Sequence, residues 1–338
     1  MLSGVKVARI TEVSGNPFAD LWHHQNGRFR SPPGCPWVDR RHSAQMLPVL
    51  AQLAISGNKP FQFPSGHYLS RQSSLQMLDS TTDEPSISWL GQACFYIRFK
   101  GLRVLTDPFL SERASPLRFG GPRRLVPAPI GIKDLAPDVI VISHNHYDHL
   151  DTNALSYIVD KANITVITTL KTGRLLRKLG FKRVIEMDWY QQLVDGGSQY
   201  QCLPAYHFSG RNLMDENRAL WGSFSIEHNG VKVFFAGDTG YGAEFLRIGR
   251  LTGPYDIALV PIGAYSPRSV FAAVHADPEE AIKIGEDIGA RHLIGMHWGT
   301  VRLTTESMVE PAERFLAAQS RVGKSIMAIG ETRPLVPR

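Results

Sequence analysis

The stretch ISHNHYDHLD, residues 142–151, places three histidines and two aspartates directly behind the apolar run DVIVIS at 138–143. A solvated loop more often uses Ser, Gly, Asn or Lys, and a core strand avoids these groups because unpaired buried imidazoles and carboxylates are costly. Imidazoles and carboxylates are also common metal ligands. The pattern HxHxDH therefore indicates a metal site where a buried strand ends.

The spacing within the motif divides its side chains into two groups. If the segment is extended, its side chains alternate, so His144 and His146 point the same way and can bind one ion. Asp148 and His149, one step further round the turn, can reach a second ion. Ligands of this kind without a thiolate suit Zn²⁺, with Mn²⁺ or Fe²⁺ as alternatives.

Three further candidate ligands follow strand-like runs downstream. They are His207 in LPAYHFSG, Asp238 in FFAGDTGY and His297 in IGMHWGT. A single histidine at a strand end is more often structural or simply exposed. Together with HxHxDH, and in this order, the three residues indicate a site for two metal ions.

The composition excludes several classes of protein. The chain has 338 residues, is 43% hydrophobic and carries a net charge of +6, which is compatible with anionic substrates or a membrane surface. Basic residues are not interleaved with aromatic ones, so no nucleic-acid partner is expected. Cys35, Cys94 and Cys202 lie far apart, which argues against a disulfide framework and a cysteine-bound zinc. Without a signal-like start or a run of eighteen apolar residues, we expect a cytoplasmic protein.

The chain divides near residue 85. Residues 1–85 mix aromatics with Pro and Gly, which predicts an irregular N-terminal extension that packs on the main body, with one short helix at 43–55. Residues 86–338 are expected to form the catalytic domain. Its strand-like runs lie at 87–99, 102–108, 138–143, 164–169, 200–205, 221–228, 231–238, 256–262 and 292–297. Helical patterns lie at 152–160, 171–179, 242–250, 277–288 and 306–319. This order predicts an α/β fold of stacked sheets with helices outside.

These motifs resemble the metallo-β-lactamase superfamily, and within it the N-acyl-phosphatidylethanolamine-hydrolysing phospholipase D branch and its bacterial relatives. The resemblance covers roughly residues 86–305. It rests on SWLGQACF, LTDPFL, SHNHYDHLD, PAYHFSGR, LWGSFSI, FAGDTGY, VPIGAY, HADPEEA and HWGT.

The resemblance implies an αββα sandwich with a two-zinc site. One ion would take His144, His146 and His207. The other would take Asp148, His149 and His297, and Asp238 with a water or hydroxide would bridge the two ions.

Several other residues have two interpretations each. The resemblance places His275 near the substrate phosphate, where it would hold the phosphate or protonate the leaving oxygen; alternatively, it caps the following helix. Asp107 either orients a ligand histidine or forms a turn before Pro108. Arg211, with Asn212 and Arg218, either binds an anionic head group or lies in a solvated loop.

The function that the resemblance implies is hydrolysis of N-acyl-phosphatidylethanolamine to an N-acylethanolamine and phosphatidic acid. Asp148, Asp238 and His275 are the expected catalytic residues, and His275 and Arg211 the expected substrate contacts. The partner would be a phospholipid or another phosphodiester, with peripheral contact at the inner face of a membrane, and a homodimer stays open. The alternatives are a metal-dependent lactonase, and after it a nuclease or a non-catalytic metal-binding protein.

Overall fold

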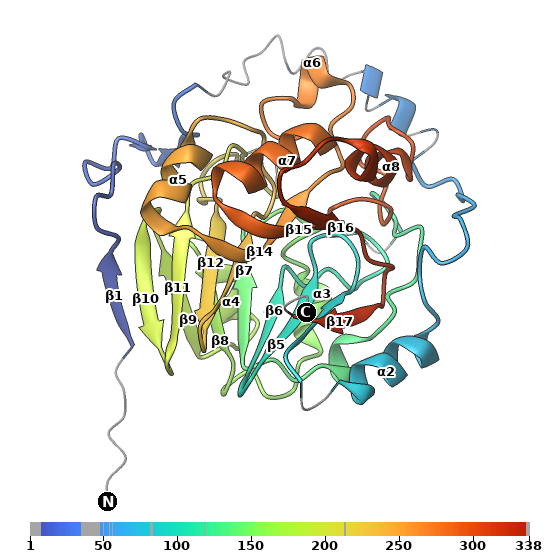
Figure 1. Ribbon diagram of the computed structural model, residues 1–338, viewed down its shortest axis with the longest axis horizontal. Coiled ribbons are helices and arrows are strands. Elements are labelled where there is room, and N and C mark those ends of the chain that lie inside the picture. Colours follow the sequence, from blue (N-terminus) through green and yellow to red (C-terminus); the bar gives the residue numbers. More distant parts are fainter. Residues whose placement is uncertain are drawn as a thin grey trace, which may run out of the picture.

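Two β-sheets form the centre of the molecule (Figure 1). The computed structural model describes residues 8–34, 48–49, 51–53, 55, 57–81, 84–117, 119–212 and 214–335. In spatial order, the eight-stranded sheet contains β1 (Arg9–Glu12), β10 (Gln191–Asp195), β11 (Ser198–Leu203), β12 (Ser223–His228), β13 (Val231–Phe235), β14 (Tyr255–Pro261), β15 (Ala290–Met296) and β16 (Gly323–Ser325). The seven-stranded sheet contains β17 (Thr332–Pro334), β4 (Ser86–Trp89), β5 (Phe95–Phe99), β6 (Leu102–Thr106), β7 (Val139–Ile142), β8 (Thr165–Thr169) and β9 (Arg183–Met187).

Strand β7 shows why the central strands are continuous apolar runs. Its side chains alternate between two faces, and all four are buried. Val139 and Val141 join the large core that also contains residues of the eight-stranded sheet, whereas Ile140 and Ile142 join a second core with helical residues such as Leu155 and Leu176. A strand that is covered on both faces has apolar residues at successive positions instead of alternating apolar and polar ones.

Helices cover the outer faces of the two sheets. Helix α7 (Pro278–Asp287) packs on β14 and β15 and contacts α5 (Glu244–Thr252) and α8 (Glu310–Ala317). The seven-stranded sheet is covered by α3 (Thr152–Ser156) and α4 (Gly173–Lys178), and α2 (Arg71–Ser80) contacts β17. The expected αββα sandwich is thus confirmed.

Some elements were not expected from the sequence. Strands β9 and β10 have mixed burial, and their sequences, RVIEM and QQLVD, show no clean alternation. Strands β16 and β17 have three residues each, too short for a pattern. Helix α2, with the sequence RQSSLQMLDS, has two buried residues and no apolar stripe of the usual width.

The described part of residues 1–85 is more regular than expected. Strand β1 pairs antiparallel with β10 at the edge of the eight-stranded sheet, and β2 (His24–Gln25) pairs with β3 (Arg28–Phe29). The described residues of the expected 43–55 helix are helical, and Val49 packs near the short helix α6 (Arg268–Phe271). The other residues of that helix and Cys35 lie outside the described residues. The boundary at residue 85 stays a prediction.

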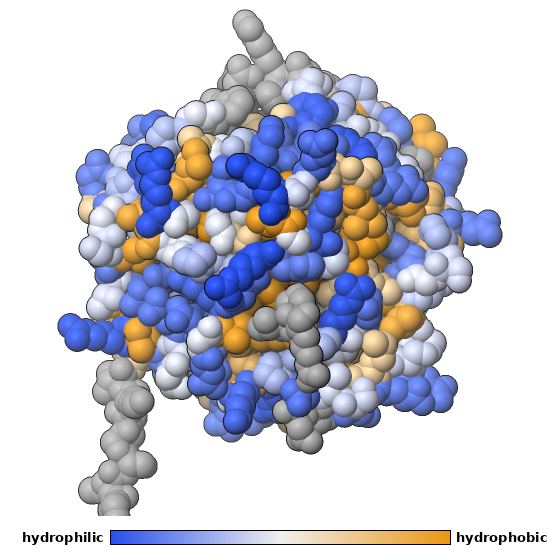
Figure 2. Space-filling model, in the orientation of Figure 1, coloured by the Kyte–Doolittle hydropathy of each residue, from blue (hydrophilic) through white to orange (hydrophobic). Residues whose placement is uncertain are grey.

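Neither the face shown in Figure 2 nor the described helices have the features of a membrane span. On the face shown in Figure 2, hydrophobic and hydrophilic residues are interspersed. Among the described residues, no helix has the length and apolar character that a membrane span requires.

The two-sided core makes a matched pair of substitutions informative. Val104 of β6 is fully buried between the sheets, whereas Val159 is 95% exposed. We expect Val104→Ala to lower the free energy of unfolding by about 2 kcal/mol, because it loses buried methyl groups and leaves a cavity. The same change at Val159 should stay within about 0.5 kcal/mol of wild type. Urea unfolding measures both, and equal effects would contradict the assigned core.

Candidate metal centre

The candidate ligands meet where strands of both sheets end. Strands β6 and β7 are parallel, as are β13, β14 and β15, so their carboxyl ends share one edge of the sandwich. His144 follows β7, Asp238 follows β13 and His297 follows β15. The arrangement of the strands therefore brings residues that are far apart in the chain into one cluster.

One group of ligand atoms consists of three imidazole nitrogens. His146 Nδ1 lies 2.8 Å from His144 Nε2 and 3.2 Å from His207 Nε2. A tetrahedral ion with bonds of about 2.1 Å separates its ligand atoms by about 3.4 Å. Small outward shifts of these side chains would therefore admit a cation.

The second group combines imidazoles with carboxylates. His297 Nε2 lies 3.2 Å from His149 Nε2 and 3.3 Å from Asp148 Oδ2. Asp238 lies between the two groups, with Oδ2 at 3.1 Å from His149 Nε2 and at 3.8 Å from His207 Nε2. Its position fits the bridging role that the resemblance implies.

Hydrogen bonds on the outer side of the rings aim their lone pairs at the centre. His207 Nδ1 lies 2.9 Å from the carbonyl oxygen of Val274, which can only accept, so this nitrogen carries the hydrogen. His149 Nδ1 likewise donates to Asp107 Oδ2 at 2.6 Å. The inward Nε2 atoms can then act as ligands wherever they carry no proton. Acceptor atoms that face one another with carboxylates suit a cation, so the residues fit a metal pair.

Asp107 orients the candidate ligand His149, in agreement with the first of its two interpretations. It is fully buried, and besides His149 it accepts hydrogen bonds from the backbone N and the Oγ of Ser143. Ser143 Oγ in turn lies 2.9 Å from His144 Nδ1. One carboxylate therefore supports a histidine of each group.

The two groups differ in their protonation. Burial lowers the pKa of His146 to about 3 and that of His207 to about 4, and it holds the pKa of His144 well below its ordinary value. Burial alone would do the same to His149 and His297. The carboxylates of Asp238 and Asp148 instead raise the pKa of His149 well above its ordinary value and that of His297 to about 9. Without a cation, these carboxylates thus favour protonated imidazoles in the second group.

His275 lies beside the centre and does not cap the following helix. Its ring centroid is 5.1 Å from that of His207 and 5.7 Å from that of His297, and its buried Nδ1 has no hydrogen-bond partner among the described residues. The cap of α7 is Asp277, which forms a reciprocal capping box with Glu280. The capping interpretation of His275 is therefore wrong.

The structure gives Arg211 partners within the protein. Its Nη1 donates to the carbonyl oxygens of Asn145 and Leu150, both at 2.9 Å, and its guanidinium lies 3.8 Å from the ring centroid of Tyr147. These contacts hold the HxHxDH loop. Substrate binding by Arg211 stays a prediction. Asn212 and Arg218 are exposed, in agreement with the interpretation that they lie in a solvated loop.

Gln92 is a site residue that the motif analysis did not single out. It is 1% exposed, and its Nε2 lies 2.8 Å from Asp148 Oδ2 and 2.9 Å from His297 Nε2. It belongs to the quoted motif SWLGQACF, where it is the one long polar side chain inside an apolar run. Its isolation among apolar residues is the feature of the sequence that could have identified Gln92 as a site residue.

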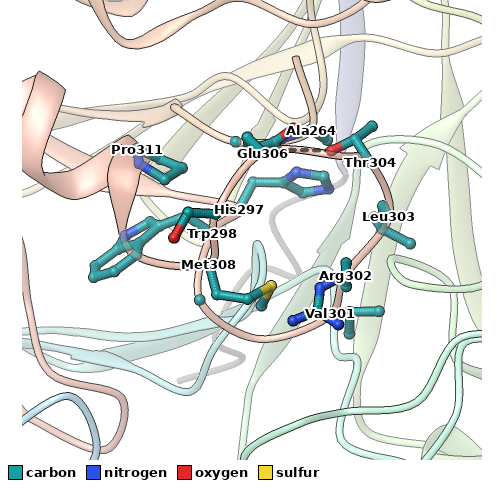
Figure 3. Close-up of a pocket in the computed structure, with 13 residues that line it drawn as sticks. Ala264, His297, Trp298, Val301, Arg302, Leu303, Thr304, Glu306, Met308 and Pro311 are labelled. Carbon is teal, nitrogen blue, oxygen red and sulfur yellow. Dashed lines mark hydrogen bonds between the residues drawn. The ribbon is translucent and has the colours of Figure 1, made fainter. Parts of the chain in front are cut away.

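A small cavity lies next to His297 (Figure 3). The loop of residues 299–308 curves around it, and Glu306 closes the loop by accepting hydrogen bonds from Thr304 Oγ1 and the backbone N of Ala264, both at 2.7 Å. Its volume of about 20 Å³ accommodates a water molecule. This cavity is too small for an acyl chain.

Comparison with known proteins identifies the family. Residues 102–298 match the family described as the beta-lactamase superfamily domain. The chain belongs to the β-lactamase superfamily. The resemblance seen in the motifs is thereby confirmed.

Individual relatives agree with this assignment. An uncharacterized protein of Mycobacterium tuberculosis is 40% identical over 69% of this chain, which spans 63% of that relative's length. The N-acyl-phosphatidylethanolamine-hydrolyzing phospholipase D 1 of Caenorhabditis elegans is 36% identical over 67% of each protein. Among solved structures, the isothiocyanate hydrolase from Delia radicum gut bacteria superposes with a TM-score of 0.60 at 20% identity, covering 74% of this chain and 99% of that one, which supports the fold.

Proton displacement is a measurable consequence of the second group. The raised pKa of His149 and that of His297, about 9, favour protonated imidazoles near pH 7 when no cation is bound, so an ion that binds there would displace protons. We expect Zn²⁺ binding to release protons, and one of the two binding steps to tighten as pH rises from 6 towards 9. The other step, at imidazoles that are already neutral, should change little. Calorimetry in buffers of different ionisation enthalpy measures the release, and its absence would contradict the assignment.

Proposed function

We propose that this protein is a metal-dependent hydrolase of phospholipase D type, which holds two Zn²⁺ ions and cleaves N-acyl-phosphatidylethanolamine-like lipids to an N-acylethanolamine and phosphatidic acid. The observation that carries the proposal is the pair of ligand groups that share Asp238, with His275 beside them. The relative of that name in Caenorhabditis elegans supports the substrate class.

The ions would be held by His144, His146 and His207 in the first group and by Asp148, His149 and His297 in the second, with Asp238 between them. When bound, such a pair supplies Lewis acidity that lowers the pKa of water and neutralises phosphoryl oxygens. The protein's own side chains fix the ligand atoms, through Asp107 and the carbonyl of Val274.

His275 is suited to hold the phosphate. Burial keeps the pKa of His275 well below its ordinary value, and nearby cations would lower it further. A neutral imidazole donates one N–H but cannot deliver the proton of an imidazolium. Of the two roles expected from the sequence, we therefore favour a hydrogen bond to a phosphate oxygen over protonation of the leaving group.

Access to the centre favours an amphipathic substrate. Of the seven candidate ligands, His146 is the one that is partly exposed, and the ring of Phe208 lies 4.6 Å from it. Phe208 is 36% exposed and Met214, on the same loop, 78%. Apolar side chains at the entrance suit a lipid tail and shallow contact with a membrane surface.

A second loop adds apolar surface on the side of Tyr147. Phe109 and Ala114 form a small core that packs against Tyr147, and the same loop exposes Leu117 (65%) and Phe119 (91%). We propose that the two loops together form the peripheral membrane contact.

A panel of substrates tests the proposed function. The zinc-loaded protein should hydrolyse N-acyl-phosphatidylethanolamine and bis-p-nitrophenyl phosphate, and should leave a homoserine lactone and a labelled RNA intact. Metal analysis should give about two ions per chain. Lactone opening without phosphodiester cleavage would transfer the assignment to a lactonase, and full activity without metal would refute the metal-dependent mechanism.

The role of His275 is tested by comparing two leaving groups. Loss of a hydrogen bond to a charged phosphate should lower the activity of His275→Ala by about 10- to 100-fold on both the lipid and the p-nitrophenyl diester. p-Nitrophenolate leaves without a proton, so a much larger loss on the lipid alone would instead identify His275 as the proton donor.

The control is a second buried histidine outside the centre. His228 contacts Ser198 and the carbonyl of Lys100. His228→Ala should leave both activities close to those of the wild-type protein.

A further inference from the structure

Gln92 is held in place more firmly than a surface turn requires. Its backbone N donates to Thr300 Oγ1 at 2.9 Å, and its carbonyl oxygen accepts from Trp89 Nε1 and from the backbone N of His297, both at 3.0 Å. Its φ of 52° is in the left-handed region, which a non-glycine residue enters at a cost. The surrounding hydrogen bonds offset that cost and fix where the side chain begins.

The residue before it leaves no room for movement. Gly91 has a φ of +96°, and a Cβ atom there would lie 2.8 Å from Arg124 Nη2 and 3.1 Å from Thr300 Oγ1. Arg124, which is buried, donates from the same Nη2 to the carbonyl oxygen of Leu90 at 3.0 Å. The turn that carries Gln92 is therefore anchored on both sides.

The side chain of Gln92 makes one contact that a bound cation would leave intact. Its Nε2 donates to Asp148 Oδ2 at 2.8 Å. The other groups near this carboxylate are His149 and His297, whose Nε2 atoms would turn to the ion. Among the described residues, Gln92 is then the remaining side-chain donor to Asp148.

We propose that Gln92 is a positioning residue that sets the affinity of the second ion, the one held by Asp148, His149 and His297. This inference rests on the proposed two-ion centre. The amide fixes the orientation of Asp148, and its link to the backbone of His297 couples the two ligands. The first group, around His146, has no such contact with Gln92 among the described residues.

The test measures the affinity of each ion rather than activity. Metal-free protein is titrated with Zn²⁺ against a chromogenic chelator, which resolves two dissociation constants. We expect Gln92→Met to weaken one of the two by about 10- to 100-fold, as is typical when the partner of a metal ligand is removed, and to leave the other unchanged.

A second variant separates positioning from packing. Gln92→Glu keeps the shape but places a carboxylate beside Asp148, where the two negative charges repel unless a cation lies between them. It should therefore tighten the same ion that Gln92→Met weakens. A purely structural role would make both variants weaker.

Gln201 provides a matched control. It is also buried, its Nε2 donates to Gln192 Oε1 at 2.9 Å, and its Oε1 has no partner among the described residues, as is true of Gln92 Oε1. Gln201→Met should leave both dissociation constants unchanged. Unchanged constants in Gln92→Met, or equal weakening of both ions, would overturn the inference about Gln92. A wild-type protein that binds fewer than two ions would instead overturn the two-ion centre.

Discussion

Lone pairs and carboxylates that face one another across a few ångströms repel unless positive charge lies between them. The carboxyl ends of strands from both sheets bring four buried histidines and two buried aspartates, together with the partly exposed His146, into this arrangement. Asp107, Ser143 and the carbonyl of Val274 then fix the rings with their lone pairs inward. The sandwich can hold such a cluster because its own core, on both faces of strands such as β7, provides the stability that the cluster does not.

The two groups of candidate ligands reduce the repulsion between their lone pairs and carboxylates in different ways. The first relies on burial, which keeps His144, His146 and His207 neutral, so the group can accept an ion without losing a proton. The second keeps its carboxylates ionised and balances them with protons on His149 and His297. Although Asp238 lies between the groups, the pKa shifts of their histidines therefore run in opposite directions.

The sequence predicted which residues come together in the cluster, because each candidate ligand follows a strand and belongs to a residue type that is rare in its context. It also predicted the layers, since runs such as DVIVIS are buried on both faces. It missed β9, an edge strand, and β10, which is only partly buried, because neither shows a clean apolar alternation. It also left His275 between two roles, although Asp277 with Glu280 three residues later fits a capping box. The contacts of Arg211 and Gln92 depend on tertiary structure, and the only local sign of them was the isolation of Gln92 in an apolar run.

The pairing of β17 with β4 has a consequence for synthesis of the chain. Residues 86–89 are synthesised well before their neighbours in the sheet, residues 332–334. The centre has a similar delay, since His297 follows His144 by nearly half the chain. A nascent chain must therefore carry an open sheet edge until residues 332–334 are made, and a partial set of candidate ligands until His297 is made, which makes it a candidate client for chaperones at that stage.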